Sequence, residues 1–174
     1  ATNPASMVWV GSRMDLGLSW FSPRRDAERT GAGIPPLNGK VTSDSTSFFI
    51  PEFGYNRMLG SDLAVGLTVY GNGGMDTDYP QGSFQCPTSP TTMAPANMLC
   101  GAGKLGQDLA QLIVAPTVAY KLSPQHSVGA ALLLGYQRFK AYGLQAFQGL
   151  STSPTNVTDN GYASSTGVGI RLGW

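Results

Sequence analysis

The sequence has few charged residues, no long run of one charge sign and no long hydrophobic run. Asp, Glu, Lys and Arg make up only 12% of the 174 residues, about half of their usual share in globular proteins. The basic pair Arg24-Arg25 is followed closely by Asp26 and Glu28, so we expect no nucleic-acid partner. No apolar stretch approaches the length of a membrane-spanning helix, so any membrane crossing has to use β-strands.

The residue types that carry most catalytic chemistry are also scarce. His126 is the single histidine, and it lies in a predicted tight turn where turn chemistry explains the neighbouring serines. No metal-ligand spacing occurs, and the glycines at 167, 169 and 173 do not have the spacing of a dinucleotide-binding loop. We therefore expect no enzymatic activity, no cofactor and no metal site.

What the sequence does contain is alternation of apolar residues with small or polar ones. This pattern is typical of a strand whose two faces meet different environments. It occurs in residues 13–22, 48–57, 63–70, 111–121, 128–137 and 167–174. One face of each segment is almost wholly apolar, and we interpret it as lipid-facing and the other as lumenal. Pro51 and Pro116 each remove one ladder donor, which predicts a local bulge near them.

Short and long connections alternate between these segments. Tight turns are predicted near 59–62 and 123–126, and long loops at about 23–46, 71–107 and 141–160. Aromatic residues mark both ends of the strands, with Trp20-Phe21, Tyr70 and Tyr136 toward the long loops, and Tyr55, Tyr120 and Trp174 toward the turns. Short periplasmic turns, long outside loops and two aromatic belts indicate an antiparallel transmembrane β-barrel of the bacterial outer membrane.

The two cysteines, Cys86 and Cys100, lie in one stretch rich in Pro, Thr, Ser and Asn. They are compatible with a disulfide that closes a short loop, which requires an oxidising compartment. Two free thiols are the alternative.

Several motifs resemble the FadL/TodX family of outer-membrane transporters, in the same order along nearly the whole chain. They are Asn3-Pro4-Ala5, Gly17-Leu18-Ser19-Trp20-Phe21-Ser22-Pro23-Arg24-Arg25, the segment from Tyr70 to Pro80, Leu112 to Tyr120, and Tyr136-Gln137-Arg138-Phe139-Lys140. The resemblance implies passive uptake of long-chain fatty acids or hydrocarbons through a fourteen-stranded barrel with an N-terminal hatch. Only about six strands are present here, so we expect the chain to be one portion of such a barrel, completed by further strands.

Position by position, the resemblance assigns residues 1–12, with Asn3, Pro4 and Ala5, to the end of the hatch and residues 13–174 to the barrel wall. It also implies an inward kink in the third strand, through which substrate leaves sideways into the outer-membrane lipid. The kink falls on Gly71, Asn72, Gly73 and Gly74. Glycines suit a break in the ladder because they permit unusual backbone angles and carry no side chain.

A fatty-acid carboxylate requires a cation at the end of an apolar groove. Arg138 and Lys140, with Phe139 between them, are the candidate ligand-binding residues. Simple alternation instead directs both cations to the lipid side, where they would extend toward lipid headgroups. Alternative functions for the chain are a general diffusion porin, a surface adhesin or structural β-domain, and a soluble lipocalin-like carrier.

Overall fold

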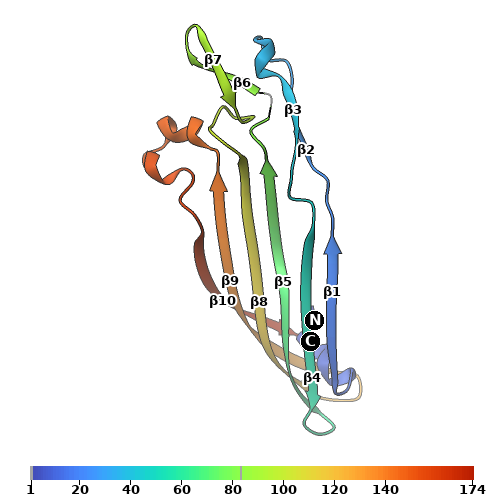
Figure 1. The fold of residues 1–174 in the computed structure, drawn as a ribbon. Helices are drawn as coiled ribbons and strands as arrows, with labels where there is room; N and C mark the ends of the chain where they lie inside the picture. Colours follow the sequence, from blue (N-terminus) through green and yellow to red (C-terminus); the bar gives the residue numbers. More distant parts are fainter. Residues whose placement is uncertain (1, 83) are drawn as a thin grey trace.

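The computed structural model describes residues 2–82 and 84–174 and contains one large antiparallel sheet. Its six strands follow the order β1-β4-β5-β8-β9-β10, so each pairs with the next large strand along the chain (Figure 1). The strands are β1 (Arg13–Phe21), β4 (Phe48–Met58), β5 (Leu63–Tyr79), β8 (Leu105–Lys121), β9 (Ser127–Tyr142) and β10 (Ala163–Gly173). The predicted all-β antiparallel fold is confirmed.

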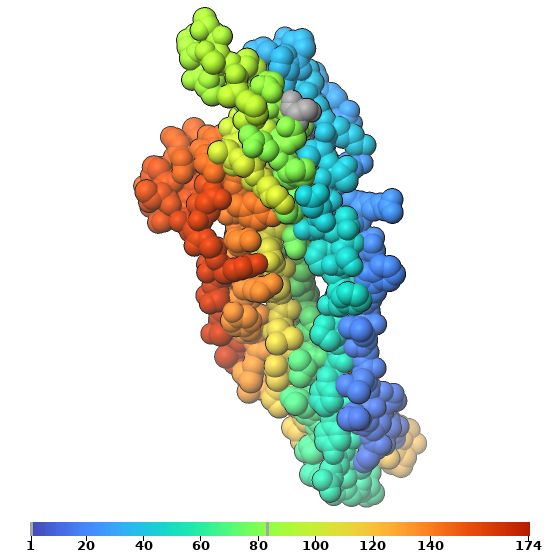
Figure 2. Space-filling view, in the orientation of Figure 1, coloured from blue at the N-terminus to red at the C-terminus, as the bar shows by residue number. Residues whose placement is uncertain are grey.

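The tight turns and the long connections lie at opposite ends of this sheet (Figure 1). The long connections carry smaller elements: β2 (Asp26–Arg29), η2 (Pro35–Leu37), β3 (Gly39–Thr42), β6 (Phe84–Ser89), β7 (Thr92–Ala96), η3 (Gln145–Leu150) and η4 (Pro154–Asn156). The β2–β3 and β6–β7 hairpins lie side by side at the far end of the elongated molecule (Figure 2).

The predicted loop at 71–107 is too long, because strand pairing continues into it from both sides. β5 and β8 pair as far as Tyr79 and Leu105, and the connection between them is only 80–104. Beyond Gly74 these strands carry polar residues such as Asp76, Asp78 and Gln107. The apolar-polar contrast that marks a strand in the sequence is lost there, although the backbone ladder persists.

The two faces of the large sheet differ as the alternation predicts. The face that bears the apolar set, called the convex face below, leaves those side chains largely uncovered. They include Met14, Leu16, Leu18, Trp20, Phe49, Val118, Leu132, Leu134, Tyr136, Val168, Ile170, Leu172 and Trp174. Leu16 is 74% exposed and Ile170 is 74% exposed. Five of the six strands, all but β5, contribute exposed residues to this set, and an exposed apolar surface of this kind is typical of a protein face that contacts lipid or another protein.

The opposite, concave face is covered at its turn end by the N-terminal 3-10 helix η1 (Pro4–Trp9). Met7 and Val8 pack there against Ala64 and Ala119 in the small buried core. The curvature of the sheet brings distant strands together across this face: Arg171 of β10 donates a hydrogen bond to the Tyr70 hydroxyl of β5 over 3.3 Å. Tyr70 therefore faces the concave side, as the alternation in 63–70 predicts.

One local hydrogen bond and two long-range ones fix the segment around η1 on the sheet. The Asn3 side chain accepts from the amide of Ala5 at 3.0 Å and donates to the Trp174 carbonyl at 3.2 Å. The buried Asn56 amide donates to the carbonyl of Met7 at 2.8 Å. Small concave-face residues make the close approach possible, since a Cβ on Gly129 would lie 2.6 Å from the Ala5 nitrogen.

The sheet is open at both edges in the described part of the chain. β1 and β10 each pair with one neighbour only. Long unpaired edges expose rows of backbone donors and acceptors, which proteins normally pair or cover. Within residues 2–82 and 84–174, no helix has the length and apolar character needed to cross a membrane.

Candidate functional site

The candidate site is an opening in the sheet between β4 and β5. The β1–β4 ladder continues to Phe21 and Phe48, whereas the β4–β5 ladder stops at the pair Glu52 and Tyr70. β5 itself continues as far as Tyr79, paired with β8. The segments Phe48–Pro51 and Gly71–Met75 therefore diverge, and we call the gap between them the window.

Two local features of the sequence lie at the lower end of the window. Pro51 has no amide hydrogen to donate, and it immediately precedes the last β4–β5 pair at Glu52. On the other side, the β5–β8 register shifts between Gly71 and Gly73. That bulge leaves Asn72 without a partner in the ladder and bends the strand away. Pro51 and Pro116 keep their register in the β1–β4 and β5–β8 ladders. The β4–β5 ladder ends next to Pro51, and the β8–β9 ladder has no pair at Ala115 or Pro116, so each proline interrupts one ladder without the register shift of a bulge.

The bulge also exchanges the two faces of β5. On the turn side of the bulge, odd-numbered residues such as Val69 face the convex side. Beyond the bulge, even-numbered residues face that side: Asp76 lies opposite Asp108 of β8, and Asp78 lies opposite Gly106. One inserted residue is sufficient for this exchange because side chains alternate with a period of two.

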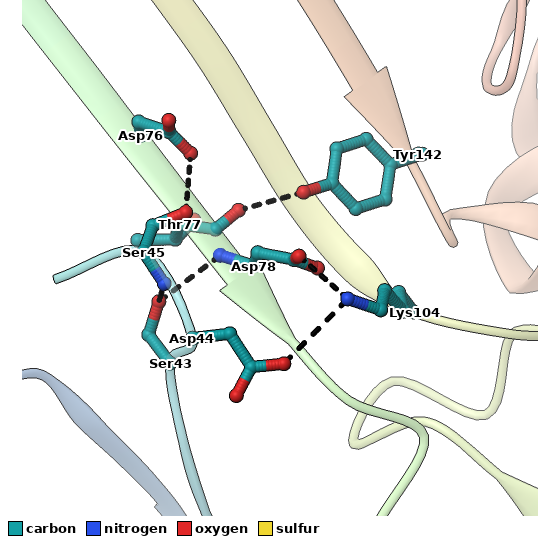
Figure 3. A network of polar contacts seen from close by, with 8 residues as sticks. All are labelled: Ser43, Asp44, Ser45, Asp76, Thr77, Asp78, Lys104 and Tyr142. Carbon is teal, nitrogen blue, oxygen red and sulfur yellow. Dashed lines mark hydrogen bonds and ion pairs between the residues drawn. The ribbon is translucent and has the colours of Figure 1, made fainter. Parts of the chain in front are cut away.

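Polar contacts close the upper end of the window (Figure 3). The chain after β3 crosses to the free edge of β5, where the Asp44 amide donates to the Asp78 carbonyl at 2.8 Å. The buried Ser43 hydroxyl accepts from the Asp78 amide at 3.0 Å, and the Ser45 hydroxyl donates to the Asp76 carboxylate at 2.9 Å. Residues 43–45 thus replace β4 as the neighbour of β5 above the gap.

An ion pair strengthens this upper boundary. The Lys104 ammonium lies 2.7 Å from one Asp78 oxygen and 3.5 Å from Asp44 (Figure 3). The Asp78 carboxylate raises the pKa of Lys104, so the ammonium stays charged throughout the physiological range. Lys104 comes from the β7–β8 connection, so the boundary unites two long loops with the end of β5.

The window opens into a cavity of about 690 Å³. Its lining includes Phe48, Ile50 and Phe21 from the concave side and Phe49 and Leu112 from the convex side. The rings of Phe21 and Phe48 are 6.3 Å apart. Side chains from both faces of the sheet therefore line the cavity; its lining is mostly apolar, and Arg25, Asp76, Asp108 and Arg138 form its polar upper part.

A second cavity, of about 840 Å³, lies on the concave face and is more polar. Its lining includes Arg13, Asp15, Glu52 and Arg171. The Arg13 guanidinium pairs with the Asp15 carboxylate. An apolar molecule on the concave side would therefore find its apolar surface at the window and not in this polar cavity.

The sequence-predicted residues fall in different parts of this arrangement. Gly71, Gly73, Gly74 and Asn72 line the window, and Asn3, Pro4 and Ala5 belong to the segment around η1. Arg138 and Lys140 lie on the convex face, where both contact the Tyr162 ring and Arg138 also lines the cavity. Phe139 pairs with Leu109 on the concave side, so the structure brings the two candidate cations together but not the phenylalanine between them.

Sequence reasoning missed the other wall of the window and its upper boundary. Phe48 and Ile50 lie in a predicted strand, but no local pattern gives them a role in a site, and Ser45 and Asp76 fall inside predicted loops. The sequence signal for this wall is Pro51, because proline has no backbone N–H to donate to a neighbouring strand. The pairing partner of residues 43–45 is a tertiary contact with no sequence pattern of its own.

The Cys86–Cys100 disulfide is formed, which confirms the pairing and excludes the alternative of free thiols. It lies beside Arg29 of β2, whose guanidinium donates to the Met98 carbonyl at 2.7 Å and stacks over Phe84 at 5.3 Å. The two long connections that carry β2–β3 and β6–β7 are thus joined above the window.

A comparison with the models of known protein families finds no match, and a comparison with curated protein sequences finds no significant match.

Proposed function

We propose that this chain forms part of the wall of a transmembrane β-barrel in the bacterial outer membrane that passes hydrophobic small molecules. The ligand enters on the concave side and leaves through the window between β4 and β5 into the surrounding lipid. The observation that carries this proposal is the window itself, with a mostly apolar cavity that is lined by side chains from both faces of the sheet and lies beside the exposed apolar face.

The two faces of the sheet support a position in the membrane. The convex face exposes leucine, isoleucine and valine side chains to an extent that costs free energy in water but none in lipid. The open edges of β1 and β10 support closure by further strands, as in the fourteen-stranded barrel of the family that the sequence resembles. The N-terminal segment lies on the concave side, where a hatch would close the lumen.

Lateral exit suits the chemistry of an apolar cargo. A molecule that leaves through the wall goes directly from an apolar cavity into lipid, without crossing the charged concave cavity. Movement of this kind follows the concentration gradient of the ligand and needs no cofactor.

The test is uptake of a labelled long-chain fatty acid by lipid vesicles that contain the full-length gene product. Gly71→Val is the decisive variant, because a Cβ at position 71 would lie 3.3 Å from the Ile50 side chain across the window. Gly33→Val is the matched control, since a Cβ there meets nothing within 4 Å. We expect uptake to be lost in the first variant and kept in the second.

Equal uptake in both variants would contradict lateral exit. The polar concave cavity makes a general diffusion porin the second candidate. Uptake of small sugars by the same vesicles, undiminished by Gly71→Val, would favour that function instead.

A further inference from the structure

The convex face carries one compact group of charged and aromatic side chains at the upper end of the apolar surface. It consists of Arg138 and Lys140 of β9, Asp108 of β8 and Tyr162, which precedes β10. Arg138 and Lys140 alternate with Phe139, so they share the face of Tyr136 and Leu134. They follow the last exposed apolar residues of that strand.

The tyrosine ring holds both cations in place. The Arg138 guanidinium carbon lies 4.8 Å from the centroid of the Tyr162 ring, and the Lys140 nitrogen lies 4.9 Å from the same centroid. The Tyr162 hydroxyl in turn donates to the Asp108 carboxylate. Two long cationic side chains are therefore gathered over one fixed ring before any ligand arrives, which lowers the entropy lost on binding.

The group itself holds two cations and one carboxylate, and Asp76 of β5 lies opposite Asp108 in the β5–β8 ladder, where it accepts a hydrogen bond from the Ser45 hydroxyl. Asp108 lies 3.5 Å from Arg138 and is its one carboxylate partner in the described chain. Lys140 contacts the rings of Tyr142 and Tyr162, and no carboxylate within residues 2–82 and 84–174 pairs with it. The Arg138 side chain is still 48% exposed, so its guanidinium has donors free for an incoming anion.

We infer that Arg138, Lys140 and Tyr162 bind the phosphate of a phosphorylated lipid from the leaflet around the barrel. This inference rests on the proposed membrane position of the convex face. The phosphate would lie between the two cations, and the acyl chains would extend down over Tyr136, Leu134 and Val168. Charge complementarity and the adjoining apolar surface together select a lipid over a free anion.

The experiment is native mass spectrometry of the detergent-solubilised full-length protein with three probes. They are dioleoyl phosphatidic acid, dioleoylglycerol, which has the same chains without phosphate, and inorganic phosphate. We expect only phosphatidic acid to remain bound. The double variant R138Q/K140Q should lower its affinity roughly thirtyfold, since each of the two cations near a lipid surface contributes on the order of one kcal/mol.

The control variant R24Q/R57Q removes the same charge from exposed positions away from the group, and we expect it to bind as wild type does. Lys140→Gln alone is the second variant; it breaks no ion pair, so it keeps the test valid if the double variant folds poorly. An equal loss in R138Q/K140Q and R24Q/R57Q, or equal retention of dioleoylglycerol, would overturn the inference. If inorganic phosphate bound as strongly as phosphatidic acid, the site would recognise a free phosphate, and the inference that its ligand is a lipid would be wrong.

The lipid site and the transport function fail independently. Gly71→Val, which tests the window, should retain phosphatidic acid as wild type does. Loss of uptake in that variant with lipid binding intact would support both proposals.

Discussion

Replacing Leu16 by arginine should show directly whether the convex face lies in lipid. Along the strands, Leu16 lies at a level between Trp20, toward the long loops, and Tyr55 of β4, which pairs with Met14 toward the turns. Leu16 is 74% exposed on β1. The leucine therefore has few protein contacts to lose. In water such an exposed substitution changes the free energy of unfolding by about 0.5 kcal/mol or less. At the centre of a bilayer the same arginine costs roughly 2–4 kcal/mol.

Ser19→Arg is the matched control on the same strand. Ser19 is exposed and faces the concave side, three residues from Leu16, so we expect a change within about 0.5 kcal/mol. Urea titration of the full-length protein folded in lipid vesicles measures both values. A cost for Leu16→Arg below about 1 kcal/mol, or an equal cost for both variants, would refute the assignment of the convex face to lipid.

Three further outcomes are expected. Asn56→Ala removes a buried hydrogen bond to the Met7 carbonyl and a partly buried one to the Gly11 carbonyl. It should cost about 1–3 kcal/mol and speed amide exchange in residues 4–9, and unchanged exchange there would contradict the anchoring role. Cys86→Ser removes the disulfide between two cysteines that are 14 residues apart, and it should destabilise the loop that they close by about 3 kcal/mol. Limited proteolysis between residues 80 and 104 should become faster, while fatty-acid uptake is kept. The hydrogen bond from Lys40 lowers the pKa of Asp26 from its ordinary 3.8. The Asp26–Lys40 interaction therefore stabilises the β2–β3 hairpin fully above pH 3.8, and this stabilisation is lost as the pH falls through the lower pKa of the folded state. The NMR titration midpoint of Asp26 should lie below 3.8 in the wild type and return toward 3.8 in Lys40→Met.

Much of the architecture could be predicted from local sequence patterns. The alternation in segments such as 13–22 and 128–137 identified the six large strands and assigned their apolar face. Turn residues near 59–62 and 123–126 placed the tight connections. These features are readable because strand periodicity and turn chemistry each depend on residues close together in the chain.

The positions of the strand ends were less predictable. β5 continues from Gly71 to Tyr79 and β8 begins at Leu105, although the sequence there suggests a loop. Above the apolar surface both faces of these strands carry polar residues, so a strand and a loop have the same composition. Backbone pairing between β5 and β8 decided the outcome.

The residue types show where a gap between β4 and β5 could form, but long-range contacts are needed to make these positions a gap. Gly71, Gly73 and Pro51 each weaken a ladder locally, and all three are visible as residue types. Whether the gap becomes a window depends on Ser45 and its neighbours covering the upper edge of β5. That contact joins segments about thirty residues apart, and its geometry follows from the curvature and register of the whole sheet, which no local pattern encodes.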